Sequence, residues 1–173
     1  MRLGMLTVLI ETRNDEDGLT RTLASLVGGA VEGVVRDVIV CDGGSTDQTQ
    51  RVAEHAGCNY IAGGGVAAAI RQAKGEWLLM LEPGARLVDG WIEPVLVHTA
   101  KLAMPARFSR ARGSSAPFLS RVFSRPTALA EGLVITKRQA TALSRNAQSA
   151  EAIARGLATR KLDGEIFVAP KAK

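Results

Sequence analysis

Residues 38–47 read Val-Ile-Val-Cys-Asp-Gly-Gly-Ser-Thr-Asp, an apolar run that stops at a polar turn. A short apolar run rich in β-branched residues is typical of a buried strand, and Asp-Gly-Gly-Ser is typical of a tight turn. Two further apolar runs, Leu6–Ile10 and Trp77–Leu81, flank this one in the chain. Such runs, separated by helical segments, suit a parallel sheet covered on both faces. We therefore expect an α/β fold of three layers, with a mostly parallel sheet in which Leu6–Ile10, Val35–Cys41 and Trp77–Leu81 are adjacent buried strands.

Helix signals fall between these strands. Capping residues, apolar spacing and glycines predict helices that start near Asn14 and end at about Leu26, that follow the Asp-Gly-Gly-Ser turn to about Ala56, and that span Val66–Ala73 and about Trp91 to Lys101. The later chain predicts a strand at Leu133–Ile135, short helices at Lys137–Leu143 and Ser149–Thr159, and a last edge strand at Glu165–Val168.

Length and composition limit the class of protein. The chain has 173 residues, 46% hydrophobic and 23% charged, which suits one globular domain over residues 1–173. No apolar run approaches the roughly 18 residues of a membrane-spanning helix. We interpret Met1–Ile10 as the start of the core rather than a signal peptide, because charged residues follow it without a small-residue cleavage site. The two cysteines, Cys41 and Cys58, lack metal-ligand spacing, which favours free thiols and a cytoplasmic location.

The charge is unevenly distributed. Residues 1–100 carry a net charge of −5 and residues 101–173 a net charge of +10. Residues 101–126 hold six cations and no acid, interleaved with three phenylalanines. This segment could lie against an anionic membrane surface, which would make the protein peripheral to the membrane, or it could be a solvated connection. No nucleic-acid-binding motif accompanies it, so we expect no specific nucleic-acid partner.

In an open parallel sheet, ligands bind beyond the carboxyl ends of the strands. The turn after the first strand, Glu11-Thr12-Arg13-Asn14, contains no glycine, which argues against a dinucleotide-binding fingerprint. A P-loop and a Gly-x-Ser-x-Gly elbow are also missing from the sequence. The absence of these three motifs argues against the commonest nucleotide-cofactor sites and against an α/β-hydrolase site.

Three segments together resemble a known family. They are Glu11-Thr12-Arg13-Asn14-Asp15, the stretch 38–47, and Ala73-Lys74-Gly75-Glu76-Trp77 with the apolar run after it. Over about residues 5–97 their order and spacing resemble the nucleotide-binding half of family 2 glycosyltransferases, and most closely a small bacterial branch. The resemblance implies a GT-A-like (Rossmann-like) fold, with a nucleotide-binding half at 1–100 and a reduced, basic acceptor-side half at 101–173.

The resemblance also implies a function and a set of binding residues. The function is transfer of a sugar from a nucleotide-sugar donor to an acceptor that the sequence does not identify, with a lipid-linked or cell-envelope molecule as one option. The implied nucleotide-binding residues are Thr12, Arg13, Asn14, Asp42 and Gly43. Asp42 can accept hydrogen bonds from a base or ribose, and its alternative role is to hold its own Asx turn.

The chain departs from the family at two positions that carry chemistry. The Asp-x-Asp metal motif is replaced by Glu82, Pro83 and Gly84, which leaves Glu82 to ligate Mg²⁺ or Mn²⁺ together with a nucleotide. The Glu-Asp pair that supplies the catalytic base falls on residues 149–150, Ser-Ala, and Glu131 is the candidate substitute. Two functions therefore stay open: a glycosyltransferase, or an inactive homologue that acts as a nucleotide-binding, partner or regulatory protein.

Overall fold

The computed structural model describes residues 5–63, 65–112 and 127–170. Within them one mixed sheet has the strand order β3-β2-β1-β4-β7-β6-β8-β5. The strands are β1 (Leu6–Thr12), β2 (Val35–Asp42), β3 (Asn59–Ala62), β4 (Trp77–Leu81), β5 (Arg86–Leu87), β6 (Ala106–Arg110), β7 (Leu133–Thr136) and β8 (Arg160–Phe167). The helices are α1 (Glu16–Val31), α2 (Thr49–His55), α3 (Val66–Gln72), α4 (Ile92–Lys101), α6 (Lys137–Leu143) and α7 (Ala150–Ala154).

The three strands expected to be adjacent lie side by side inside the sheet, in the order β2-β1-β4. β1 pairs in parallel with both neighbours, and β2 pairs in parallel with β3. The strands from residues 101–173 make the sheet mixed, because β7 runs antiparallel to both β4 and β6. The prediction of adjacent buried strands is confirmed. The first hundred residues build the parallel block β3-β2-β1-β4, while β6 and β8 form a second parallel pair and β5 runs antiparallel to β8.

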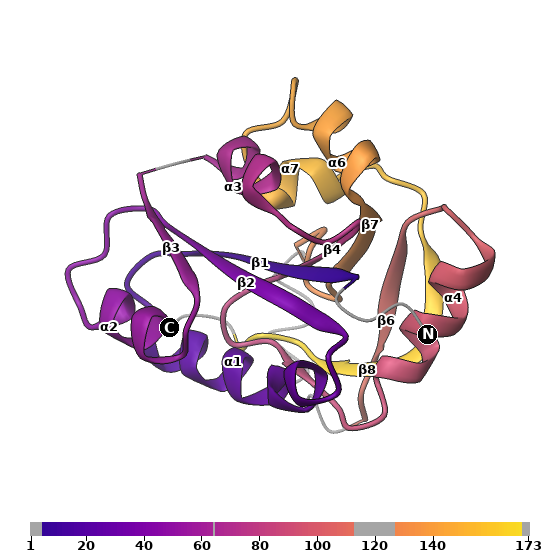
Figure 1. The fold of residues 1–173 in the computed structure, drawn as a ribbon, viewed down its shortest axis with the longest axis horizontal. Coiled ribbons are helices and arrows are strands. Elements are labelled where there is room, and N and C mark those ends of the chain that lie inside the picture. The colour runs from indigo at the N-terminus through magenta and orange to yellow at the C-terminus, as the bar shows by residue number, and fades with distance from the viewer. Residues whose placement is uncertain (1–4, 64, 113–126, 171–173) are drawn as a thin grey trace, which may run out of the picture.

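Helices cover both faces of the sheet, as expected. Figure 1 shows α1 and α2 on one side and α3, α6 and α7 on the other. One core joins Leu19 and Leu26 of α1 to Val8 and Ile10 of β1. The second core is built by α3, α6 and α7 against the other face of β1, β2 and β4. The carboxyl ends of β1, β2 and β4 are thereby held at one edge of a rigid frame.

Helix α1 runs to Val31, five residues beyond the predicted end at Leu26. The apolar spacing that predicted the helix stops at Leu26, but the helix continues through the glycine pair at 28–29, where Gly29 leaves room for Trp91. A Cβ on Gly29 would lie 2.7 Å from the Trp91 indole. Burial of this large ring against the helix outweighs the low helix propensity of glycine.

The C-terminal part differs most from the predictions. The strand expected at the edge of the sheet is β8, which starts at Arg160 and lies between β6 and the short β5. Helix α7 ends at Ala154 instead of Thr159. Strand β6 was not predicted, because the run of six cations over residues 101–126 pointed to an anion-facing segment or a solvated connection. Among the described helices, none has the length and apolar character needed to cross a membrane.

Candidate nucleotide site at the strand ends

An open hollow of about 620 Å³ lies where β1 and β2 end. Four of the five predicted nucleotide-binding residues line it, namely Thr12, Arg13, Asp42 and Gly43. Asn14, the fifth, is not among the lining residues. The hollow sits at the carboxyl edge of parallel strands, where open α/β sheets bind their ligands.

Thr12 is the last residue of β1 and pairs across the sheet with Asp42 of β2. Paired residues of neighbouring strands project to the same face, so both side chains lie on the same side of the sheet. Thr12 is buried, and its hydroxyl oxygen has no hydrogen-bond partner in the described parts of the chain. Buried polar groups rarely lack partners, so this hydroxyl marks a place where a ligand atom would be stabilised.

Asp42 holds the turn that follows β2. Its Oδ1 accepts hydrogen bonds from the backbone N–H of Gly44 and Ser45 and from the Ser45 hydroxyl, at 3.1, 2.9 and 2.6 Å. Its Oδ2 accepts one from the Tyr60 hydroxyl at 2.5 Å. Burial raises the pKa of Asp42, but these hydrogen bonds together outweigh it and hold the pKa below its usual value. The Asx-turn role is thus observed, and Oδ2 keeps lone-pair capacity for one more donor.

Tyr60 was not expected near this site. It lies on β3 opposite Val40, two residues before the partner of Asp42, so it can reach Asp42 diagonally across the strands. The hydrogen bond to Asp42 raises the pKa of Tyr60 to about 12. The aromatic residue in the short third strand was the one available signal.

Asn14 joins two loops rather than lining the hollow. It adopts a left-handed backbone conformation, with φ of 49°. Its Oδ1 accepts a hydrogen bond from the Thr46 N–H at 2.7 Å, and its own N–H donates to the Ser45 hydroxyl at 2.8 Å. Its role as a direct nucleotide ligand stays a prediction, while its contacts hold the loop that follows β1 against the loop that follows β2.

Glu11 is a lining residue to which the sequence assigned no role. Its carboxylate accepts a hydrogen bond from the backbone N–H of Ala150, the first residue of α7, at 2.5 Å. Burial raises the pKa of Glu11, and the hydrogen bond from Ala150 opposes that rise. The residue ties the end of β1 to the start of α7.

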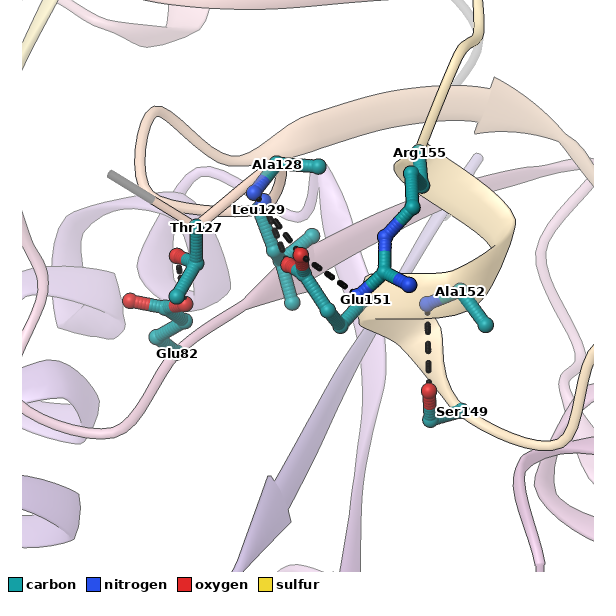
Figure 2. Close-up of polar contacts among 8 residues, drawn as sticks. All are labelled: Glu82, Thr127, Ala128, Leu129, Ser149, Glu151, Ala152 and Arg155. Atoms are coloured by element: carbon teal, nitrogen blue, oxygen red, sulfur yellow. Dashed lines mark hydrogen bonds and ion pairs between the residues drawn. The ribbon is translucent and has the colours of Figure 1, made fainter. Parts of the chain in front are cut away.

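Glu82, the candidate metal ligand, follows β4 and lies near Thr127 and Glu151. Its carboxylate accepts a hydrogen bond from the Thr127 hydroxyl, as Figure 2 shows. Burial raises the pKa of Glu82, the Thr127 hydroxyl opposes the rise, and the nearby charge of Glu151 adds to it. Glu82 is thus a half-buried carboxyl group beside a second carboxylate.

Glu151 of α7 binds the backbone at the start of the segment before β7. Its two oxygens accept hydrogen bonds from the N–H groups of Ala128 and Leu129, each at 2.9 Å, and Figure 2 shows the side chain reaching toward both. It also forms an ion pair with Arg155 at 3.6 Å. Residues 127–129 are therefore clamped between Glu82 and Glu151.

Glu131, the candidate base, forms ion pairs with two arginines of β6. Its oxygens lie 3.3 Å from Nε of Arg107 and 3.2 Å from Nε of Arg110. It sits just before β7, at the same edge of the sheet as Glu82. Each carboxylate oxygen meets one arginine nitrogen and keeps lone-pair capacity for a further donor, such as an acceptor hydroxyl.

The described residues contain no group of three or more His, Cys, Asp or Glu side chains that could hold a metal ion. Pro83 and Gly84 offer no side-chain ligand. A cation bound here would take Glu82 and complete its shell with phosphate and water oxygens, which Mg²⁺ accepts.

The basic segment 101–126 is described only up to Arg112. Its described part completes α4 and forms β6, with Phe108 buried and Arg107 and Arg110 paired to Glu131. This part is built into the sheet rather than being a solvated connection. Contact with a membrane surface also depends on Arg121 and Arg125, which lie outside the described residues.

Comparison with known proteins places this geometry in a family. The family model for glycosyl transferase family 2 matches residues 7–104, more than half of the chain. The comparison with curated proteins found no match to the chain.

Solved structures share the fold at low sequence identity. Glucosyl-3-phosphoglycerate synthase from Mycobacterium tuberculosis, in complex with Mn²⁺, UDP and glucosyl-3-phosphoglycerate, has 16% identity and a TM-score of 0.61, with 96% of this chain and 72% of that chain covered. TarS from S. aureus has 19% identity and a TM-score of 0.65, with 96% of this chain but 35% of that chain covered. These similarities confirm the GT-A-like α/β fold.

The family match covers β1 to α4, and hence both strands that end at the hollow, the turn held by Asp42, and Glu82. The chain belongs to glycosyltransferase family 2.

Proposed function

We propose that this chain binds a nucleoside-diphosphate sugar at the ends of β1 and β2 and transfers the sugar to an acceptor bound beside β6 and β7. The observation that carries the proposal is the buried, unpartnered hydroxyl of Thr12, next to Asp42 in a hollow of about 620 Å³. Family membership identifies the class of ligand, and the structural neighbours that bind UDP and Mn²⁺ support it.

In this proposal each group has a defined task. Oδ2 of Asp42 and the hydroxyl of Thr12 bind the base or ribose, and Arg13, which is exposed, lies over the same ligand. Glu82 shares a Mg²⁺ or Mn²⁺ ion with the diphosphate, and the ion would balance charge on the leaving group. Glu131 accepts the proton of the acceptor hydroxyl through the lone pairs that Arg107 and Arg110 leave open.

The second candidate function is a nucleotide-binding homologue without turnover. Two observations favour it: Glu131 is held by two arginines, and the expected base position carries Ser149 and Ala150. Such a protein would bind nucleotides through the same Thr12 and Asp42 but leave the donor intact.

The binding step is tested by Thr12→Val, which removes the hydroxyl and keeps the shape. Because the hydroxyl has no hydrogen-bond partner among the described residues, Thr12→Val should keep or increase the free energy of unfolding. Calorimetry with UDP, GDP and related nucleotides, with and without Mn²⁺, should show a weakening of about three- to tenfold for the nucleotide that binds wild type. Thr159→Val, at a threonine outside the hollow, is the control and should bind like wild type.

Turnover separates the two candidates. Release of nucleoside diphosphate from a sugar donor that binds, with production of free or transferred sugar, supports the transferase. A donor that binds tightly and stays intact supports the non-catalytic homologue. Binding of no nucleotide to wild type contradicts both.

A further inference from the structure

A second hollow, of about 670 Å³, lies at the other end of β4. It is bounded by Lys74, Gly75 and Glu76, which precede β4, and by Lys137, Arg138, Thr141, Ala142 and Arg145 on and after α6. Since β4 spans five residues at about 3.3 Å each, this hollow lies on the order of 16 Å from the strand ends that form the candidate nucleotide site. The two hollows share no lining residue.

Positive charge dominates the second hollow. Four cations line it, against one carboxylate, Glu76. Lys74, Arg138 and Arg145 are exposed, and their side chains form no ion pair with another described residue. Cations left without carboxylate partners on the wall of a concave surface attract an anion to it.

The α6 wall has a shape suited to a small anion. Arg138, Thr141, Ala142 and Arg145 follow each other at intervals of three, one and three residues, so they fall on one side of the helix and its last turn. Thr141 and Ala142, which lie between the two arginines on this side, have short, exposed side chains. The arginines stand at the ends of this side, about 10 Å apart along the helix axis.

The floor of the hollow is held rigidly by backbone contacts. A Cβ on Gly75 would lie 2.6 Å from the Met5 carbonyl oxygen, so only glycine allows this close approach. The Lys137 N–H donates to the Glu76 carbonyl at 2.8 Å, and Nζ of Lys137 donates to the Ala73 carbonyl at 2.6 Å. Lys137 thus fixes the wall, while the three other cations remain available to a ligand.

We propose that this hollow binds a phosphate group between Lys74, Arg138 and Arg145. Guanidinium groups match the oxygens of a phosphate in a two-point geometry, and an ammonium adds a point charge. The phosphate can belong to a soluble phosphoryl compound or to the headgroup of an anionic lipid, since both present the same oxygens. The proposal does not depend on sugar transfer.

The test uses the whole chain with two probes. Pyrophosphate is titrated while backbone amide signals are followed by NMR, so that shifts at Gly75, Thr141 and Ala142 are distinguished from shifts at Gly43 and Gly63 in the nucleotide hollow. Cosedimentation with phosphatidylglycerol–phosphatidylcholine vesicles, against vesicles of phosphatidylcholine alone, tests the lipid source. The variant is Arg138→Gln with Arg145→Gln, and the control is Arg21→Gln with Arg51→Gln on α1 and α2, which removes the same charge elsewhere.

We expect wild type and the control to bind pyrophosphate at this hollow, or to bind the anionic vesicles, and the Arg138/Arg145 variant to bind about tenfold or more weakly. Added salt should weaken the binding further. Binding to vesicles without binding of pyrophosphate assigns the phosphate to a lipid. Equal loss in the control and the variant, unchanged binding by the variant, or no binding of either probe by wild type overturns the proposal.

Discussion

At the scale of a single residue, the raised pKa of Glu82 predicts how stability depends on pH. Its pKa is raised above that of an unfolded glutamate, chiefly by burial, so the folded protein binds this proton more tightly than the unfolded chain. Stability is therefore lost as the pH rises from the unfolded pKa through the folded pKa. Glu82→Gln should unfold at higher urea concentration than wild type at pH 7, and the difference should disappear near pH 3.5.

The control for this comparison is Glu32→Gln, because Glu32 is exposed at the end of α1. Urea unfolding of the three proteins across this pH range measures the effect. A Glu82→Gln variant that is less stable than wild type at pH 7 would mean that the ionised carboxylate is needed by a partner, such as the Thr127 hydroxyl, more than burial disfavours it.

At the scale of an element, α1 offers two neighbouring glycines with opposite environments. Gly28 is exposed, and an added Cβ would meet nothing within 4 Å. Alanine there should stabilise the helix by about 0.5–1 kcal/mol. An added Cβ on Gly29 would lie 2.7 Å from Trp91 and 2.9 Å from Val35, so Gly29→Ala should destabilise by about 1–3 kcal/mol.

Chemical denaturation of both variants measures whether each substitution raises or lowers the free energy of unfolding. Because the substitution is the same and the positions are adjacent, differences in the unfolded state largely cancel. Stabilisation by Gly29→Ala would show that Trp91 does not pack on α1 as described.

A second prediction at this scale concerns the hydrogen bonds that hold residues 127–129 to α7. Glu151→Ala removes a charged acceptor from the N–H groups of Ala128 and Leu129 and should lower the free energy of unfolding by about 1–3 kcal/mol. Arg155→Ala removes only an exposed ion pair, since the Arg155 side chain is 73% exposed, and should change it by less than about 1 kcal/mol. Equal effects in urea unfolding would show that the ion pair, rather than the backbone clamp, carries the stability.

What the sequence could predict also differs between elements. The apolar runs of β1, β2 and β4 predict buried strands because they are short, lie between turn and helix signals, and suit a sheet that is covered on both faces. The alternation of buried Ala106 and Phe108 with Arg107 in β6 is a strand signal too. The positive charges obscured this strand signal, because Glu131, the acidic partner of the β6 arginines, lies some twenty residues further along the chain.

At the scale of the whole molecule, the location of the candidate site was predictable and its internal bonding was not. Residues that follow strands must gather at one edge of a parallel sheet, so Thr12 and Asp42 could be placed together from sequence. The hydrogen bonds of Asp42 with Tyr60 and of Glu11 with Ala150 join segments 18 and 139 residues apart. Such contacts depend on the strand order and on where α7 docks, which no local pattern encodes.

Ligand binding should be visible in the stability of the whole molecule, because a ligand that binds only the folded state stabilises it. A nucleotide at about one hundred times its Kd adds about 2.7 kcal/mol, which for a chain of this length raises Tm by roughly 5–10 °C. Mn²⁺ alone should leave Tm unchanged, since residues 82–84 offer one carboxylate, Glu82, and the oxygens of the neighbouring Glu151 already bind the Ala128 and Leu129 N–H groups. With nucleotide present, Mn²⁺ should raise Tm further, and Glu82→Gln should keep the nucleotide shift but lose this increment. A shift of Tm by Mn²⁺ alone would require protein ligands besides Glu82, and an increment that survives Glu82→Gln would move the ion away from the end of β4.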